Sequence, residues 1–122
     1  MKQSPIFVRT YDFICWLIPR TMNFPRSQRF VLTKRLQDAV LDFQERILEA
    51  GLSRGRKRSE CLEEADITLA KVRFYLRLTH EMEWLKPRQY AHAAEMVAEI
   101  GRLLGGWRKS NDLPESLELS GR

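Results

Sequence analysis

The chain has 122 residues, of which 43% are hydrophobic and 30% are charged. This length accommodates one globular domain, and this composition excludes a largely disordered chain. Lys and Arg outnumber Asp and Glu, 21 against 16, and the net charge of +5 favours an anionic partner: nucleic acid, an acidic protein face or a membrane surface.

The first half of the chain predicts two helices. Ser4 and Pro5 are typical of a helix start, and apolar residues at three- and four-residue spacing continue to Ile18. We expect Pro19 to end this first helix. The second helix is predicted over residues 27–50, with Gly51 at its C-terminal end. Its apolar seam consists of Leu32, Leu36, Val40, Phe43 and Ile47.

The second half of the chain also predicts two helices. The third covers residues 59–85, with Ser59 as N-cap and acidic residues in its first turn. The fourth starts at Pro87 and runs to residue 104, where Gly105 and Gly106 are expected to end it. The third seam comprises Leu62, Ala65, Leu69, Val72, Leu76 and Thr79, and the inner face of the fourth helix comprises Tyr90, Ala94, Val97, Ile100 and Leu104.

Four helices with short connections predict an all-α fold, an up-down antiparallel four-helix bundle formed by residues 1–109. Residues 110–122 contain Pro, Gly and acids without a long seam, and we expect a flexible C-terminal tail, with a short docked helix at 114–119 as the alternative. The first three helices carry more apolar positions than one buried stripe needs. We therefore expect a homo-oligomer that buries this surplus.

Basic residues gather in acid-poor segments of the chain. Residues 1–35 contain one acid, residues 54–58 contain four positive charges, and residues 71–77 contain no acid. Such segments are typical of phosphate contacts, which give affinity and salt dependence without reading bases. The residues that we expect to bind nucleic acid or a partner are Lys34, Arg35, Arg54, Arg56, Lys57, Arg58, Lys71, Arg73 and Arg77.

Catalytic and metal-binding patterns are absent from the sequence. His80 begins a His-Glu segment, but position 84, where a second metal-binding histidine would stand, is Trp84. We therefore expect no enzyme activity, no metal and no cofactor. Cys15 and Cys61 lie within apolar helical patterns, so we expect reduced, buried thiols. No apolar run is long enough to cross a membrane and no signal peptide is recognisable, so we expect a cytoplasmic protein that does not bind membranes.

Several segments together carry a resemblance to a known family. They are YDFICWLIPR at residues 11–20, FPRSQRF at 24–30, KVRFYLRL at 71–78, the Gln89-Tyr90 start of the fourth helix, and IGRLLGGW at 100–107. Over residues 5–109 the chain resembles the accessory variability determinant (Avd) family, the small accessory proteins of diversity-generating retroelements.

This resemblance implies a four-helix bundle that assembles into a barrel-shaped homopentamer. It implies binding to the element's reverse transcriptase and template RNA, support of adenine-mutagenic cDNA synthesis (mutagenic retrohoming), and no active site of its own. Arg73 and Arg77 match the family's third-helix pattern, and we expect them to contact RNA or polymerase. The resemblance assigns this role less directly to the basic cluster at residues 54–58, because that cluster is expected to lie in a loop.

Three alternatives remain at this point. A sister group, encoded in intervening sequences of bacterial 23S ribosomal RNA genes, shares the bundle and the pentameric assembly. A protein-only oligomeric adaptor would use the same arginines on acidic protein surfaces. A membrane-surface or antitoxin-like helical module is the third, although the chain lacks a basic amphipathic terminal helix.

Overall fold

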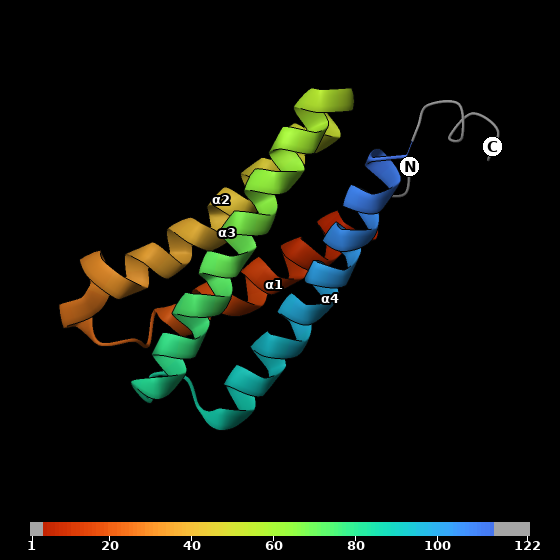
Figure 1. The fold of residues 1–122 in the computed structure, drawn as a ribbon. Helices are drawn as coiled ribbons and strands as arrows, with labels where there is room; N and C mark the ends of the chain where they lie inside the picture. The colour runs from red at the N-terminus through yellow and green to blue at the C-terminus, as the bar shows by residue number, and fades with distance from the viewer. Residues whose placement is uncertain (1–3, 114–122) are drawn as a thin grey trace.

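A computed structural model describes residues 4–113, which form four α-helices and contain no β-strand. Consecutive helices run in opposite directions, and the first helix, α1, lies beside the last, α4 (Figure 1). The predicted all-α class with four helices is therefore confirmed. The helices are α1 (Pro5–Thr21), α2 (Lys34–Gly51), α3 (Gly55–Glu81) and α4 (Pro87–Asn111), with a 3₁₀ turn (Arg26–Gln28) and a π-helical turn (Arg29–Thr33) before α2.

The predicted seams form the core of the bundle. All six predicted seam positions of α3 are buried, as are the four that lie in α2, while the fifth position of that seam, Leu32, lies in the π-helical turn and is half-buried. On α4 the inner face is rotated slightly, because Ala93 is buried while Ala94 is exposed and Tyr90 is half-buried. Each fully buried Leu or Ile stabilises the fold by about 1.5–3 kcal/mol relative to exposure.

The helix α1 passes through Pro19 and ends at Thr21, so the predicted end at Ile18 is wrong. Proline removes one backbone hydrogen bond, and only two residues of the helix follow it. Two side chains support the last turn: Arg20 Nη1 donates to the carbonyl of Trp16 at 2.6 Å, and Thr21 Oγ1 donates to the carbonyl of Ile18 at 2.6 Å.

The helix α4 likewise continues through Gly105 and Gly106 to Asn111. Contacts with the other helices hold its last turns. The ring of Trp107 packs edge-on against Phe7 of α1, with centroids 5.9 Å apart. Arg108 forms an ion pair with Asp66 of α3 at 3.0 Å. Residues 114–122, which include most of the predicted tail and its possible short helix, lie outside the described residues.

The contact between α1 and α4 includes a surface ion pair and an aromatic pair. Arg9 Nε donates to Glu99 Oε1 at 2.8 Å, and this hydrogen bond raises the pKa of Arg9 above its usual value. The ring centroids of Trp16 and His92 lie 5.0 Å apart.

The two cysteines differ in exposure. Cys15 is exposed rather than buried, because it lies outside the buried seam of α1, whereas Cys61 is buried as expected. No helix among residues 4–113 is long and apolar enough to cross a membrane.

Candidate nucleic-acid interface

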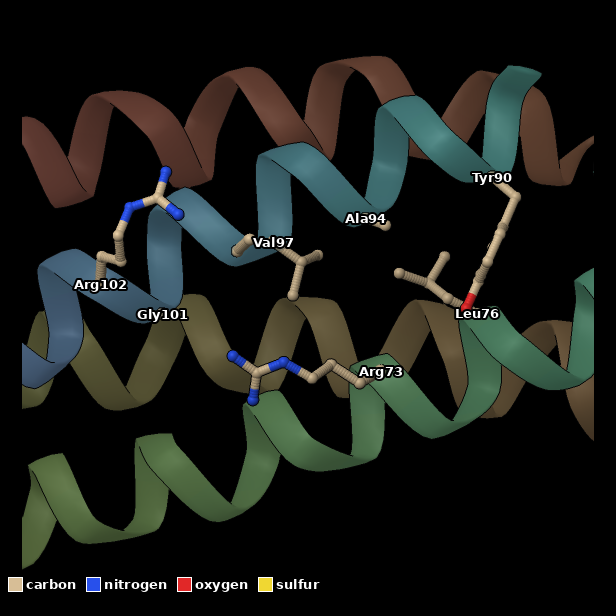
Figure 2. Close-up of a pocket in the computed structure, with 8 residues that line it drawn as sticks. Arg73, Leu76, Tyr90, Ala94, Val97, Gly101 and Arg102 are labelled. Atoms are coloured by element: carbon tan, nitrogen blue, oxygen red, sulfur yellow. The ribbon is translucent and has the colours of Figure 1, made fainter. Parts of the chain in front are cut away.

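An open groove of about 500 Å³ lies between α3 and α4. Two arginines, Arg73 and Arg102, lie toward one end, and Tyr90 stands at the other (Figure 2). Between them the floor is apolar. The lining residues are Arg73 and Leu76 of α3, and Tyr90, Ala94, Val97, Ala98, Gly101 and Arg102 of α4.

Gly101 makes room for the side chain of Arg73. A Cβ at position 101 would stand 2.5 Å from Arg73 Nη2, closer than real Cβ contacts allow. Glycine inside a helix is less favourable than alanine by about 1 kcal/mol, and at position 101, unlike positions 105 and 106, the packing gives a reason for it. Here the reason is the guanidinium, which extends from α3 across the groove toward α4 (Figure 2).

The two arginines of the groove have no side-chain partner within residues 4–113. Neither Arg73 nor Arg102 forms an ion pair or side-chain hydrogen bond among the described residues. One face of Tyr90 is covered by His80, whose ring is parallel to it at 4.3 Å, and Tyr90 also borders the groove. Guanidinium groups favour bidentate contact with phosphate or carboxylate, and aromatic faces stack on bases. The arrangement therefore suits a phosphate-bearing strand or an acidic peptide.

Arg77 is exposed one helical turn after Arg73 but does not line the groove. Lys71 is also exposed and borders a different depression, between α2 and α3, where Asp42 and Glu64 supply negative charge. The predicted third-helix residues thus lie on more than one side of α3. Among them, the structure brings Arg73 to the α3–α4 groove.

The basic cluster at residues 54–58 is not a loop, because α3 begins at Gly55 rather than at Ser59. Three cations therefore occupy its first turn, where the helix dipole disfavours positive charge. Arg58 is the half-buried member: its Nε donates to the carbonyl of Ala50 at 2.9 Å, and its guanidinium lies 5.8 Å from the centre of the Trp107 ring. The exposed members are Arg54, Arg56 and Lys57.

The two predicted residues at the start of α2 differ in their partners. Lys34 Nζ is 2.6 Å from Asp38 Oδ2, an exposed ion pair one turn apart. Arg35 is exposed and has no ion pair among the described residues. The nine predicted residues therefore do not form one patch; they occupy the starts of α2 and α3, the α2–α3 depression and the α3–α4 face.

Sequence reasoning missed Arg102 and Tyr90 as members of the groove. A signal for Arg102 was present, since a glycine within the predicted helix directly precedes it, two residues after the seam position Ile100. Within residues 4–113, no three His, Cys, Asp or Glu side chains are grouped to hold a metal ion.

Comparison with known proteins agrees with this architecture. A crystal structure of a protein of unknown function from the S23 ribosomal protein family of Bacteroides thetaiotaomicron is similar, with a TM-score of 0.77 and 20% sequence identity. The match covers 85% of this chain and 95% of that one, and at this identity it shows a shared fold. No curated protein shows significant similarity. The family model described as bAvd-like matches residues 6–111, and the chain therefore belongs to the bAvd-like family.

Proposed function

We propose that this protein is the non-catalytic accessory protein of a diversity-generating retroelement. It binds the element's reverse transcriptase and template RNA through basic surfaces and supports mutagenic cDNA synthesis in the cytoplasm. The observation that carries the proposal is the bAvd-like match, which spans residues 6–111 and so includes all nine predicted binding residues.

The free cations on the α3–α4 side support RNA as a partner. Among residues 4–113, no carboxylate lines the groove that Arg73 and Arg102 flank, and Arg77 extends the positive charge along α3. The chain as a whole carries a net charge of +5. Phosphate contacts by such residues give affinity that falls steeply with salt and carries little sequence information.

Exposed apolar side chains on α2, a neighbour of α1, support self-association, and the assembly that we propose is a homopentamer. The two helices are antiparallel neighbours, since Gln37 Nε2 donates to Thr21 Oγ1 at 2.8 Å and Phe7 packs beside Gly51 at the other end. Leu41 and Leu48 are seven residues apart on α2, and they are 43% and 49% exposed. Residues at this spacing share one helix face, and such a row is buried when subunits associate.

The RNA proposal is tested by titrating the protein with structured template RNA at several salt concentrations. The double variant Arg73→Gln/Arg77→Gln is expected to weaken binding and to reduce the salt slope by about 0.7–0.9 for each phosphate that is no longer neutralised. The control Arg88→Gln/Lys109→Gln removes the same charge at exposed positions outside the groove. Equal reductions in affinity for both variants would show that only total charge matters.

The polymerase and oligomer proposals have their own experiments. The reverse transcriptase is expected to co-purify with the wild-type protein and less with Arg73→Gln/Arg77→Gln. Light scattering is expected to show a pentamer for the wild-type protein and a smaller species for the variant Leu41→Glu/Leu48→Glu. The control Met82→Glu introduces a negative charge at a residue that is 50% exposed in the turn after α3. A wild-type species of 14.4 kDa would disprove assembly.

A protein-only adaptor is the second candidate, favoured by the apolar floor of the α3–α4 groove. In that case an acidic, apolar peptide of a partner would bind along the groove, with a carboxylate at Arg73 and Arg102 and apolar side chains on the floor. The salt titration separates the two candidates, because an adaptor would show no specific RNA binding at any salt concentration. A reverse-transcriptase gene beside this one supports the retroelement function, whereas a place inside a 23S ribosomal RNA gene would support the intervening-sequence alternative.

A further inference from the structure

A second cavity, of about 590 Å³, lies at the connection between α1 and α2, away from the α3–α4 groove. The FPRSQRF segment forms much of its wall, and no role has so far been given to this segment. Its volume falls within the range of about 300–1,000 Å³ that small-molecule sites occupy. The lining residues are Thr21, Met22, Phe24, Pro25, Arg26, Arg29, Thr33 and Gln37.

Thr33 has an unsatisfied hydroxyl group. The residue is only 5% exposed, and its Oγ1 has no hydrogen-bond partner among the described residues. A buried polar group without a partner is unfavourable, and native proteins rarely keep one without a reason. Thr33 also ends the π-helical turn, and such turns occur frequently at functional sites. A ligand that hydrogen-bonds to this hydroxyl would supply the missing partner.

The neighbouring polar group, Gln37, is already oriented. Thr21 Oγ1 donates to the carbonyl of Ile18 and accepts from Gln37 Nε2, so this hydroxyl uses its only proton within the protein. The amide oxygen of Gln37 forms no hydrogen bond among the described residues. Thr33 and Gln37 both line the cavity, and between them they hold a hydroxyl that can donate and accept and an amide oxygen that can accept.

Two arginines complete the cavity. Arg26 and Arg29 are exposed, and neither forms an ion pair or side-chain hydrogen bond among the described residues. They stand three residues apart on consecutive helical turns, a spacing that brings side chains to one face. Their guanidinium groups suit the oxygens of one phosphate. Met22, Phe24 and Pro25 supply apolar surface for a flat ring.

We propose that this cavity binds a single nucleotide unit, with its phosphate on Arg26 and Arg29 and its sugar or base hydrogen-bonded to Thr33 and Gln37. An inorganic anion would leave the apolar wall and the neutral hydrogen-bonding groups unused. The nucleotide is either a free nucleoside monophosphate or the 5′-phosphorylated end of an RNA strand. The site does not depend on the α3–α4 groove, so either proposal can fail without the other.

The test uses the full chain and two kinds of probe. Saturation-transfer NMR and calorimetry at low salt measure binding of AMP, GMP, CMP and UMP, with adenosine as the ligand without phosphate. A short oligoribonucleotide is compared with and without its 5′ phosphate. Binding of a monophosphate identifies a free-nucleotide site, and a preference for the phosphorylated oligonucleotide alone identifies a strand-end site; both results support the proposal.

Variants of the lining residues test whether the nucleotide binds in this cavity. Thr33→Val preserves the shape of the side chain and is expected to weaken binding about three- to tenfold, the value of one hydrogen bond. Its melting temperature should stay equal or rise, since an unpartnered buried hydroxyl is removed. Arg26→Gln/Arg29→Gln, at exposed positions, is expected to weaken binding at least tenfold, and Arg88→Gln/Lys109→Gln is expected to leave it unchanged.

Three results would overturn the proposal. The first is no binding of any monophosphate at millimolar concentration together with no preference for the 5′-phosphorylated strand. The second is binding that Thr33→Val and Arg26→Gln/Arg29→Gln leave unaffected. The third is displacement of the nucleotide by a glutamate-rich peptide of equal charge with equal affinity, which would make the cavity a site for acidic protein segments.

Discussion

The guanidinium of Arg73 on α3 lies over Gly101 of α4, where its Nη2 atom stands 2.5 Å from the position of a Cβ. The two residues are far apart in the chain, and each explains the other. The glycine leaves space for the arginine, and the arginine gives a reason for a glycine in mid-helix. This pair sets the shape of the cationic end of the α3–α4 groove (Figure 2).

Gly101→Ala is therefore expected to displace Arg73 without harming the fold. The far end of an arginine side chain moves easily, and alanine favours a helix by about 1 kcal/mol over glycine. Thermal melting should be unchanged or higher, while RNA or polymerase binding falls toward that of Arg73→Gln. Gly105→Ala is the matched control, because its Cβ would meet no atom within 4 Å. Equal binding by both variants would show that the position of Arg73 is unimportant.

Substitutions of Arg58 and Arg56 are expected to affect different properties, stability for Arg58 and RNA binding for Arg56. Arg58 hydrogen-bonds the carbonyl of Ala50 and lies near Trp107, whereas Arg56 is exposed. Arg58→Gln should lower the free energy of unfolding by about 1 kcal/mol, because it removes that hydrogen bond. Arg56→Gln should leave the melting temperature nearly unchanged and weaken RNA binding at low salt. Circular dichroism and an RNA titration measure both; the reverse pattern would contradict these roles.

Leu76→Ala is expected to lower the free energy of unfolding by about 2–5 kcal/mol. Leu76 is 3% exposed at a seam position of α3, so truncation leaves a cavity in the core. Phe74→Ala, two residues away, removes a larger side chain that is 60% exposed and should change stability by less than about 0.5 kcal/mol. Urea denaturation measures both, and similar effects would show that the seam is assigned to the wrong face.

Two residues with left-handed backbone conformations are expected to respond in opposite directions. Glu83 has φ 63° in the turn after α3, and Gly55 has φ 55° at its start. A side chain in this region is unfavourable by about 1–2 kcal/mol, which glycine avoids. Glu83→Gly should therefore raise the melting temperature and Gly55→Ala should lower it. Calorimetry of the two variants checks the signs, and a shift in the same direction for both would contradict the assignment.

The helix ends show where prediction from sequence was limited. Pro19, Ser59 and the pair Gly105-Gly106 are ordinary signals for the start or end of a helix, yet the structure continues through each of them. Packing of Trp107 against Phe7 and the other contacts of the last turns outweigh the local preference at Gly105 and Gly106, which is about 1 kcal/mol per glycine. Such contacts join distant segments and leave no local mark in the sequence.

The residues of the candidate site were likewise only partly predictable from the sequence. Arg73 was predicted because it stands with Arg77 in an acid-free stretch of a regular helix. Arg102 and Tyr90 were missed, because they reach the same groove from α4. Lys34 was predicted but is paired with Asp38, and Arg58 was predicted but hydrogen-bonds within the bundle. Partner choice of this kind depends on side-chain placement rather than on residue type.

By itself the sequence determined the all-α class, the buried seams of α2 and α3 and the resemblance to the family that the chain belongs to. These properties depend on spacing along one helix, which the 3.6-residue turn makes a local quantity. Only the tertiary structure decided which cations are paired within the described part of the chain, and how Arg73, Arg102 and Tyr90 come to line one groove. That outcome follows from the packing of helices against each other, where residues far apart in the chain become neighbours.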